Sequence, residues 1–210
     1  MGKILYLKAS PRTGRSHSVA VADAFIESYC QNHPDDVVET VDLFRKELPA
    51  FDLPAVTAKY KIMHTEEPRE QDRQIWSEVV SVIDEFKSAD KYVVALPMWN
   101  FSIPYRMKQY IDIIVQPGQT FTVDANGNYA GLVKDKPIFV AYSRGGQYPV
   151  GTEGEAFDLQ KRYFELILGF IGFTDIRRVI VEPTLAGGPD VSKQKREAAI
   201  EEARQMAQDF

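Results

Sequence analysis

Apolar and polar positions alternate along this chain in a regular way. Short runs rich in valine and isoleucine, typical of buried strands, are followed by longer stretches in which apolar residues recur at helical spacing. The pattern predicts strands at Gly2–Lys8, Asp36–Asp42, Lys91–Leu96, Lys136–Tyr142 and Asp175–Val181. It predicts helices near Ser18–Asn32, Arg69–Lys87, Ile103–Val115, Phe157–Phe170 and Lys193–Asp209. Such alternation favours an α/β fold in which helices cover both faces of a parallel sheet.

Five parallel strands favour one arrangement in particular. The flavodoxin-like strand order 2-1-3-4-5 suits this number of strands, and ligands in open α/β sheets bind outside the carboxyl ends of the strands. The loops after the first, third and fourth strands are therefore expected to share one site. No repeat or linker divides residues 1–210, so we expect a single domain.

Two insertions exceed what such a sheet needs. Leu43–Pro68 is long and interrupted by prolines, and a loop of this length is usually a functional cover or disordered. The segment "TFTVDANGNYAGL" places Asn126-Gly127 between partly alternating residues, which predicts a β-hairpin.

Composition and charge exclude several classes of protein. The chain of 210 residues is 44% hydrophobic, sufficient for a large core, and its one cysteine, Cys30, excludes an intramolecular disulfide and a cysteine-rich zinc site. A net charge of −5 with scattered signs argues against a nucleic-acid surface. No apolar run is long enough to cross a membrane and no signal peptide precedes the first strand, so we expect a soluble cytoplasmic protein. His33 and His64 lack ligand spacing, and no metal site is expected.

The first loop, "ASPRTGRSHS", has the features of a phosphate site without those of a phosphate-cleaving enzyme. It lacks the Walker motif, the dinucleotide-binding glycine pattern and a cysteine nucleophile. It retains the hydroxyls of Ser10, Ser16 and Ser18 at the start of a helix, where neutral donors hold a terminal phosphate. The alternative is an ordinary serine cap, at Ser18, with a polar turn.

The other two loops add surfaces for a flat ring. In "PMWNFSIP", Trp99 and Phe101 stand where water favours charged residues, which indicates an apolar planar ligand. The alternative is that both aromatic side chains pack under the long loop. In "YSRGGQYPVG", Gly145 and Gly146 allow the backbone to approach a ring edge closely, although a plain turn would have the same residues. A phosphate nest, an aromatic shelf and a glycine-rich edge together indicate a site for flavin mononucleotide (FMN).

These motifs are also familiar as a set. The chain resembles the bacterial FMN-dependent NADH:quinone oxidoreductases known as azoreductases, which have the flavodoxin-like fold. The resemblance runs nearly end to end and rests on the serine spacing, "PMWNF", "TF…NG…GL", "SRGG" and "LGFIGFTD", in this order. Trp99 departs from the family's commoner tyrosine, which leaves the preference for substrate and nicotinamide open.

The resemblance implies a set of cofactor-binding residues. Ser10, Ser16, His17 and Ser18 would hold the FMN phosphate, while Pro97, Met98, Trp99, Asn100, Phe101, Ser143, Arg144, Gly145 and Gly146 would hold the isoalloxazine ring. It also implies a homodimer with a flavin site at each end of the interface, one FMN per subunit, and Phe121, Tyr148 and Phe170 near the acceptor. Apolar surface for the dimer is expected from Arg162–Phe173.

The expected chemistry is a ping-pong reaction. NADH, or NADPH, reduces the flavin, and a quinone or azo compound then takes the same place and is reduced, with no catalytic side chain required. The backbone N–H groups near Gly145 and Gly146 would stabilise the negative charge on the reduced ring. Arg144 either adds to this or is a solvated surface charge, and His17 either touches the phosphate or is a bystander. The alternatives are a flavodoxin-type electron carrier and, less well supported, a phosphate-ester hydrolase.

Overall fold

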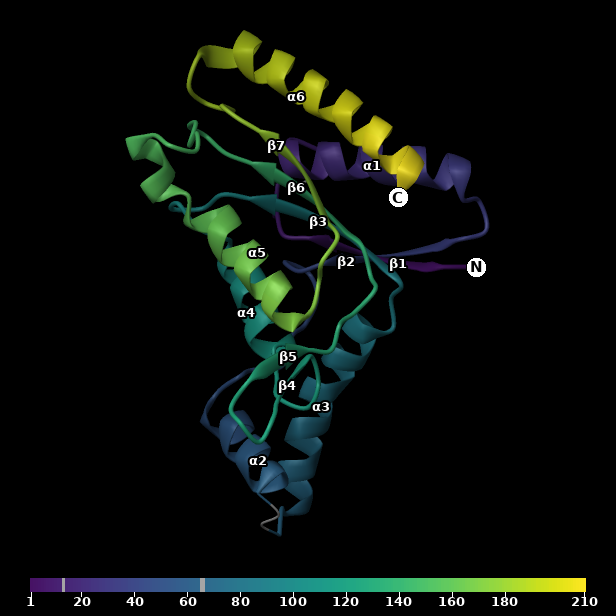
Figure 1. Ribbon diagram of the computed structural model, residues 1–210, viewed down its shortest axis with the longest axis vertical. Helices are drawn as coiled ribbons and strands as arrows, with labels where there is room; N and C mark the ends of the chain where they lie inside the picture. The colour runs from purple at the N-terminus through teal and green to yellow at the C-terminus, as the bar shows by residue number, and fades with distance from the viewer. Residues whose placement is uncertain (13, 65–66) are drawn as a thin grey trace.

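The central feature is a five-stranded parallel sheet, which Figure 1 shows nearly edge-on. The computed structural model describes residues 1–12, 14–64 and 67–210. The strands are β1 (Lys3–Lys8), β2 (Val37–Asp42), β3 (Lys91–Pro97), β6 (Ile138–Ser143) and β7 (Ile176–Val181). Their order, β2-β1-β3-β6-β7, is the predicted 2-1-3-4-5 order of the five main strands. The predicted flavodoxin-like sheet is confirmed.

Helices cover both faces of this sheet. One face carries α1 (His17–Asn32) and α6 (Gly188–Met206), and the other carries α3 (Glu70–Lys87), α4 (Tyr105–Ile114) and α5 (Leu159–Ile171) (Figure 1). The alternation along β1 explains the two layers, since Ile4 and Tyr6 belong to the core beneath α1 while Leu5 and Leu7 belong to the opposite core. All six residues of β6 are buried, as expected for a central parallel strand covered on both sides.

Over its described residues the segment Leu43–Pro68 is not a disordered loop, so that alternative is wrong, while its role as a functional cover stays a prediction. It contains helix α2 (Leu53–Met63), which packs against α3. Asp52 caps this helix by accepting the N–H of Ala55 at 3.3 Å, and Pro54 lies in the first turn, where its missing N–H costs nothing. Residues 65 and 66 lie outside the described residues.

The predicted hairpin is confirmed as β4 (Phe121–Val123) and β5 (Tyr129–Gly131), with Gly127 at a φ of 83° in the turn. It is held against the C-terminal end of α5, because the N–H of Val133 donates to the carbonyl of Ile171 at 2.9 Å. The backbones approach so closely that a Cβ on Gly131 would overlap the backbone of Gly172.

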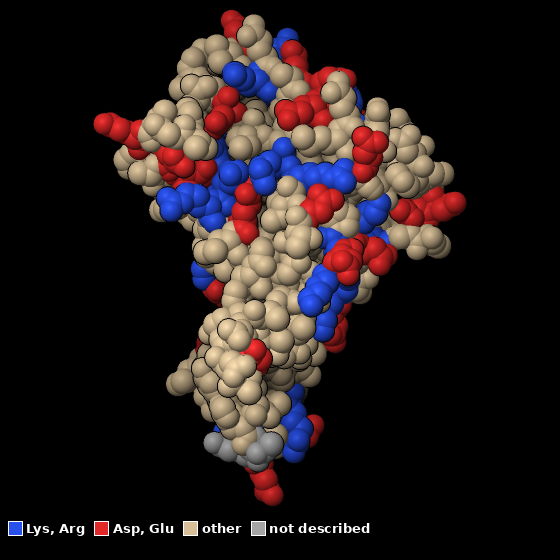
Figure 2. All heavy atoms as spheres, in the orientation of Figure 1, with Lys and Arg blue, Asp and Glu red and all other residues tan. Residues whose placement is uncertain are grey.

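Charged side chains are unevenly spread over the surface. Both signs crowd the part of the molecule around the sheet, whereas few lie over the C-terminal half of α5 and over β4–β5 (Figure 2). Within the described ranges, no helix is both long and apolar enough to span a bilayer. Nor does this part of the chain bring three or more His, Cys, Asp or Glu side chains together in a way that would hold a metal ion.

Candidate functional site

The carboxyl ends of four strands surround one small cavity of about 240 Å³. Its walls are Ser10, Arg12, Ser16, His17, Pro97, Met98, Trp99, Ser143, Gly145, Thr184 and Leu185. The loops after β1, β3 and β6 thus contribute to one site, as the sequence predicted. The loop after β7, with Thr184 and Leu185, was missed, although the same rule about strand ends applies to it.

The serine-rich end of the cavity is built around the start of α1. Ser16 is the cap of this helix, and its Oγ accepts the N–H of Val19 at 3.4 Å. Ser18 is fully buried behind it, with its Oγ 3.3 Å from that of Ser16. The Oγ of Ser10 accepts the N–H of Arg12 at 3.3 Å. The cap is therefore Ser16 and not Ser18, because α1 begins at His17, the cap directly precedes the first helical residue, and Ser18 lies inside the helix.

Arg12 and His17 lie at the same serine-rich end of the cavity. The Nδ1 of His17 is buried and has no hydrogen-bond partner among the described residues. Burial lowers the pKa of His17 below its ordinary value, and the nearby positive charges of Arg196 and Arg12 lower it further. A helix N-terminus, serine hydroxyls, Arg12 and an unpaired imidazole together fit a phosphate group.

The aromatic part of the site is a strained turn. The backbones of Trp99 and Ser102 exchange hydrogen bonds of 2.8 and 2.9 Å. Between them, Asn100 and Phe101 both have positive φ angles, 47° and 67°. Non-glycine residues rarely adopt this conformation, and it is found preferentially at binding sites.

The side chains of this turn remain accessible. Trp99 lies 5.6 Å from the ring of Phe44, in the long segment, so part of the packing alternative is correct. Trp99 is nevertheless 36% exposed and Phe101 45%. Phe101 also lies edge-on to Tyr148, with ring centroids 6.3 Å apart. The turn thus presents aromatic surface at the cavity mouth.

The glycine-rich edge is joined to its neighbours through the backbone. The carbonyl of Ser143 accepts a hydrogen bond from the N–H of Met98 at 2.8 Å, and the carbonyl of Gly145 accepts one from the N–H of Leu185 at 3.1 Å. Arg144, between them, is only 2% exposed. The alternative of a solvated surface charge at Arg144 is therefore wrong, and its guanidinium is ion-paired with Asp158 and Glu182.

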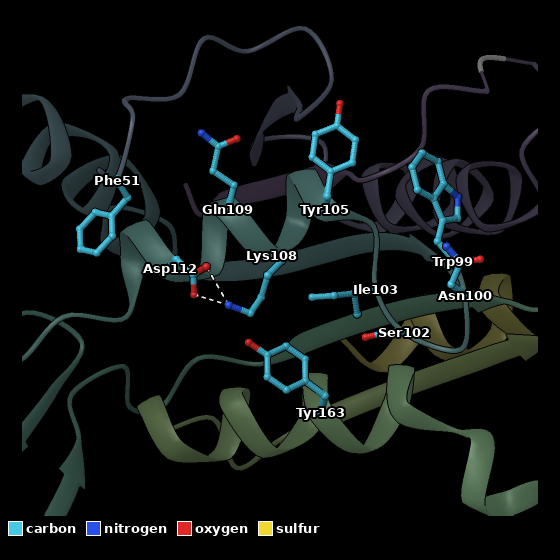
Figure 3. A pocket seen from close by; sticks show the side chains of 10 residues that line it. All are labelled: Phe51, Trp99, Asn100, Ser102, Ile103, Tyr105, Lys108, Gln109, Asp112 and Tyr163. Atoms are coloured by element: carbon cyan, nitrogen blue, oxygen red, sulfur yellow. Dashed lines mark hydrogen bonds and ion pairs between the residues drawn. The ribbon is translucent and has the colours of Figure 1, made fainter. Parts of the chain in front are cut away.

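A larger groove of about 790 Å³ adjoins this cavity at Trp99 (Figure 3). Its walls are Phe51, Trp99, Asn100, Ser102, Ile103, Tyr105, Lys108, Gln109, Asp112 and Tyr163, from α4, α5 and the preceding loops. The Nζ of Lys108 in the groove wall lies 2.6 Å from Oδ1 of Asp112, and this ion pair neutralises its charge. The groove thus has four aromatic side chains and a paired cation, and the smaller cavity is the better anion site.

The three residues expected near the acceptor are not together. Tyr148 lies beside the strained turn, as described above. Phe121 and Phe170 pack on each other with ring centroids 4.7 Å apart, at the hairpin. Neither is among the residues that line the cavity; the aromatic turn is bonded to the first residue of α5, Leu159, whereas the hairpin is bonded to its last, about 20 Å along a helix of 13 residues. Within one chain, Phe121 and Phe170 therefore do not line the cavity.

Comparison with known proteins agrees with this geometry. The family profile of the flavodoxin-like fold matches residues 2–207. An FMN-dependent NADH:quinone oxidoreductase of Nitratidesulfovibrio vulgaris (strain DP4) is 56% identical over the whole of both chains. One of Desulfotalea psychrophila is 47% identical over 88% of this chain and 87% of its own length.

The chain belongs to the FMN-dependent NADH:quinone oxidoreductase family.

Solved structures of azoreductases have the same fold. An azoreductase from Bacillus anthracis superposes with a TM-score of 0.91 at 30% identity, covering 100% of both chains. An FMN-dependent NADH-azoreductase of the same species, solved in complex with FMN, has a TM-score of 0.86 at 26% identity, covering 99% of this chain and 100% of its own. The resemblance inferred from the sequence motifs is confirmed, and membership of this family favours the oxidoreductase over the electron carrier.

Proposed function

We propose that this protein is an FMN-dependent oxidoreductase that uses NADH, rather than NADPH, to reduce quinones and azo compounds. The observation that carries the proposal is the convergence of the phosphate nest, the strained aromatic turn and the glycine-rich edge on one cavity, in a chain whose relatives bear the names given above. An electron carrier would need no aromatic groove next to its cofactor, whereas a reductase needs room for planar substrates.

The residues have distinct tasks in this proposal. Ser10, Ser16 and His17 bind the phosphate, and Arg12 adds positive charge. Trp99 lines both the cavity and the groove, and Asn100 lines the groove beside it. These two residues orient the ring and border the substrate. The N–H groups of the glycine-rich edge face the developing negative charge. Bound FMN supplies the hydride acceptor and donor, so that the chain itself needs only to bind, orient and exclude water.

The test is a spectrum followed by a turnover assay. Purified protein reconstituted with FMN should show bound-flavin absorbance and should oxidise NADH continuously when a soluble quinone is present. A flavin spectrum without quinone-dependent NADH oxidation would support the electron carrier instead. Absence of flavin binding would refute the proposal altogether.

We also propose that the protein is a homodimer whose interface includes α5 and the hairpin. Leu166 on α5 is 69% exposed, and Tyr129 and Leu132 of the hairpin region are also exposed. This apolar area is the part of the surface with few charges in Figure 2. Apolar patches of this kind mark protein–protein contacts. A partner would also bring a second aromatic pair, Phe121 and Phe170, to the interface.

A single substitution tests this interface. Leu166→Glu introduces a charge at an exposed position, so the monomer tolerates it while the interface does not. Sedimentation at micromolar concentration should show a dimer for the parent and a monomer for this variant. Val37→Glu, at an exposed apolar position on the edge strand β2, is the control and should stay dimeric. A monomeric parent would refute the proposed dimer.

A further inference from the structure

Arg144 stands out because its guanidinium is buried although it belongs to the glycine-rich edge, the Ser143–Gly146 segment. It follows β6, and the cavity wall beside it is made by its neighbours Ser143 and Gly145 rather than by its own guanidinium. A buried guanidinium is stable only when its charge and its donors are satisfied. Its partners therefore show what it fixes.

The guanidinium contacts three side chains on two elements, the start of α5 and the end of β7, and it reaches β3 through one of them, Gln160. Its Nη2 lies 2.8 Å from Asp158 Oδ2, its Nη1 lies 3.3 Å from Glu182 Oε2, and its Nε donates to Gln160 Oε1 at 3.0 Å. Asp158 caps α5 by accepting the N–H of Lys161 at 3.0 Å. Gln160, itself fully buried, donates from Nε2 to the carbonyl of Leu96, at the end of β3, at 2.9 Å. One side chain thus connects the ends of β3 and β7 with the start of α5.

The backbone of the same residue is equally constrained. The N–H of Arg144 donates to Val181 at 3.0 Å, and its carbonyl accepts both the N–H and the hydroxyl of Thr184, at 2.8 and 2.9 Å. The rings of Tyr142 and Tyr148 lie near the guanidinium, with centroids 5.8 and 5.9 Å from its carbon. The backbone and the side chain of Arg144 thus tie the Ser143–Gly146 segment to the end of β7, to the Thr184–Leu185 loop and to the start of α5.

We propose that Arg144 is a positioning residue, which holds the Ser143–Gly146 edge and the facing Thr184–Leu185 loop at a fixed place for the flavin ring. It acts through the backbone of its neighbours and does not touch the cofactor. The inference rests on the proposed function, because it concerns how tightly the ring of FMN is bound. The phosphate end of the cavity, built on the loop after β1, is independent of this network.

The test compares FMN with riboflavin, which has the same ring without the phosphate. Arg144→Lys keeps the positive charge but loses the fork that reaches three partners. Gln160→Met keeps all the charges and the approximate volume but removes the link between Arg144 and β3. The matched control is Arg178→Lys, because Arg178 makes a 2.7 Å ion pair with Glu165 at the surface of β7.

Fluorescence titration of the apoprotein variants should give the same loss for both ligands. Each of the two network variants should weaken FMN and riboflavin alike, by roughly 10-fold if about one backbone hydrogen bond to the ring is lost. The ratio of the two affinities should equal that of the parent, and the bound-flavin absorption band should shift. The control should match the parent in all three readouts.

Several outcomes would overturn the proposal. Folded variants with parent affinity for both ligands would show that the network is merely structural, and a changed ratio of FMN to riboflavin affinity would place its effect at the phosphate. If Arg144→Lys does not fold, Gln160→Met alone decides between these results, since it leaves the ion pairs in place. A parent protein that binds neither flavin refutes the proposed function and this inference with it, whereas a parent that binds both with unaffected variants refutes only the inference.

Discussion

Replacing Ser16 by aspartate separates the two tasks that we assign to this side chain. Its Oγ caps α1 by accepting the N–H of Val19, and it also lines the cavity. Aspartate is as good an N-cap as serine, and its charge is favourable at a helix N-terminus. A carboxylate at this position therefore keeps the helix but repels a phosphate. Ser16→Ala differs from Ser16→Asp in both respects, because it removes the helix cap and adds no negative charge.

The magnitudes of the two changes differ. Loss of one hydrogen bond to a charged group costs about 1.5–3 kcal/mol, so Ser16→Ala should weaken FMN binding by roughly 10- to 150-fold. Repulsion between two unit charges about 4 Å apart adds ~4 kcal/mol at an effective dielectric constant of 20, so Ser16→Asp should weaken it by about 10⁴-fold. Loss of the cap in Ser16→Ala should cost about 1 kcal/mol of unfolding free energy.

Titration with FMN and riboflavin, beside a thermal melt of each apoprotein, measures all of these quantities. Ser16→Asp should melt at the parent temperature, bind riboflavin as the parent does and lose FMN. Ser77→Ala, at an exposed serine on α3, serves as the control and should change nothing. Parent-like affinity of Ser16→Asp for FMN would show that this end of the cavity holds no phosphate, whatever else the protein binds.

Three further results are expected. The pKa of His17 is lowered, so its imidazole is neutral in the free site near neutral pH, whereas a phosphate dianion beside it favours the charged imidazolium. FMN affinity should therefore rise as the pH falls from 8 to 6.5. The rise should be smaller in His17→Gln. Calorimetry in two buffers should show proton uptake for the parent only, and equal uptake in both proteins would contradict the role of His17. Gly131→Ala should destabilise the fold by about 1–3 kcal/mol or more in denaturant unfolding, because its Cβ would overlap the backbone of Gly172, and an unchanged midpoint would disprove this contact. Initial rates with NADH and a quinone varied together should give parallel double-reciprocal lines, since both use one place in turn, while intersecting lines would require two sites.

The sequence was sufficient for the sheet because the strand signal is local. Val/Ile-rich runs such as that in β3 are buried on both faces, and their positions were correct to within a few residues. The Asn126-Gly127 pair predicted the hairpin for the same reason. Helix α2 was missed because its apolar periodicity is weak, although Asp52 followed by Pro54 is a helix-start signal that could have been used.

The meeting of the loops at the site was predictable from the sequence, but the buried contacts behind them were not. That the loops after β1, β3 and β6 meet follows from strand order alone. The role of Arg144 does not follow, because its partners Asp158, Gln160 and Glu182 are 14 to 38 residues away and carry no motif. The choice of Ser16 over Ser18 as the cap depended on the helix start, which is the least certain feature of a sequence pattern.

The cavity has a consequence for folding as well as for binding. Its walls come from the ends of β1, β3, β6 and β7, so its lining residues are spread over the chain from Ser10 to Leu185 and form a site only in the folded sheet. A ligand held there binds the native state and not the unfolded chain. By mass action, a ligand present at 100 times its dissociation constant adds about 2.7 kcal/mol to the unfolding free energy. We therefore expect the supply of cofactor to affect how much of this protein survives proteolysis, so that its abundance falls when riboflavin is scarce even if its synthesis is unchanged.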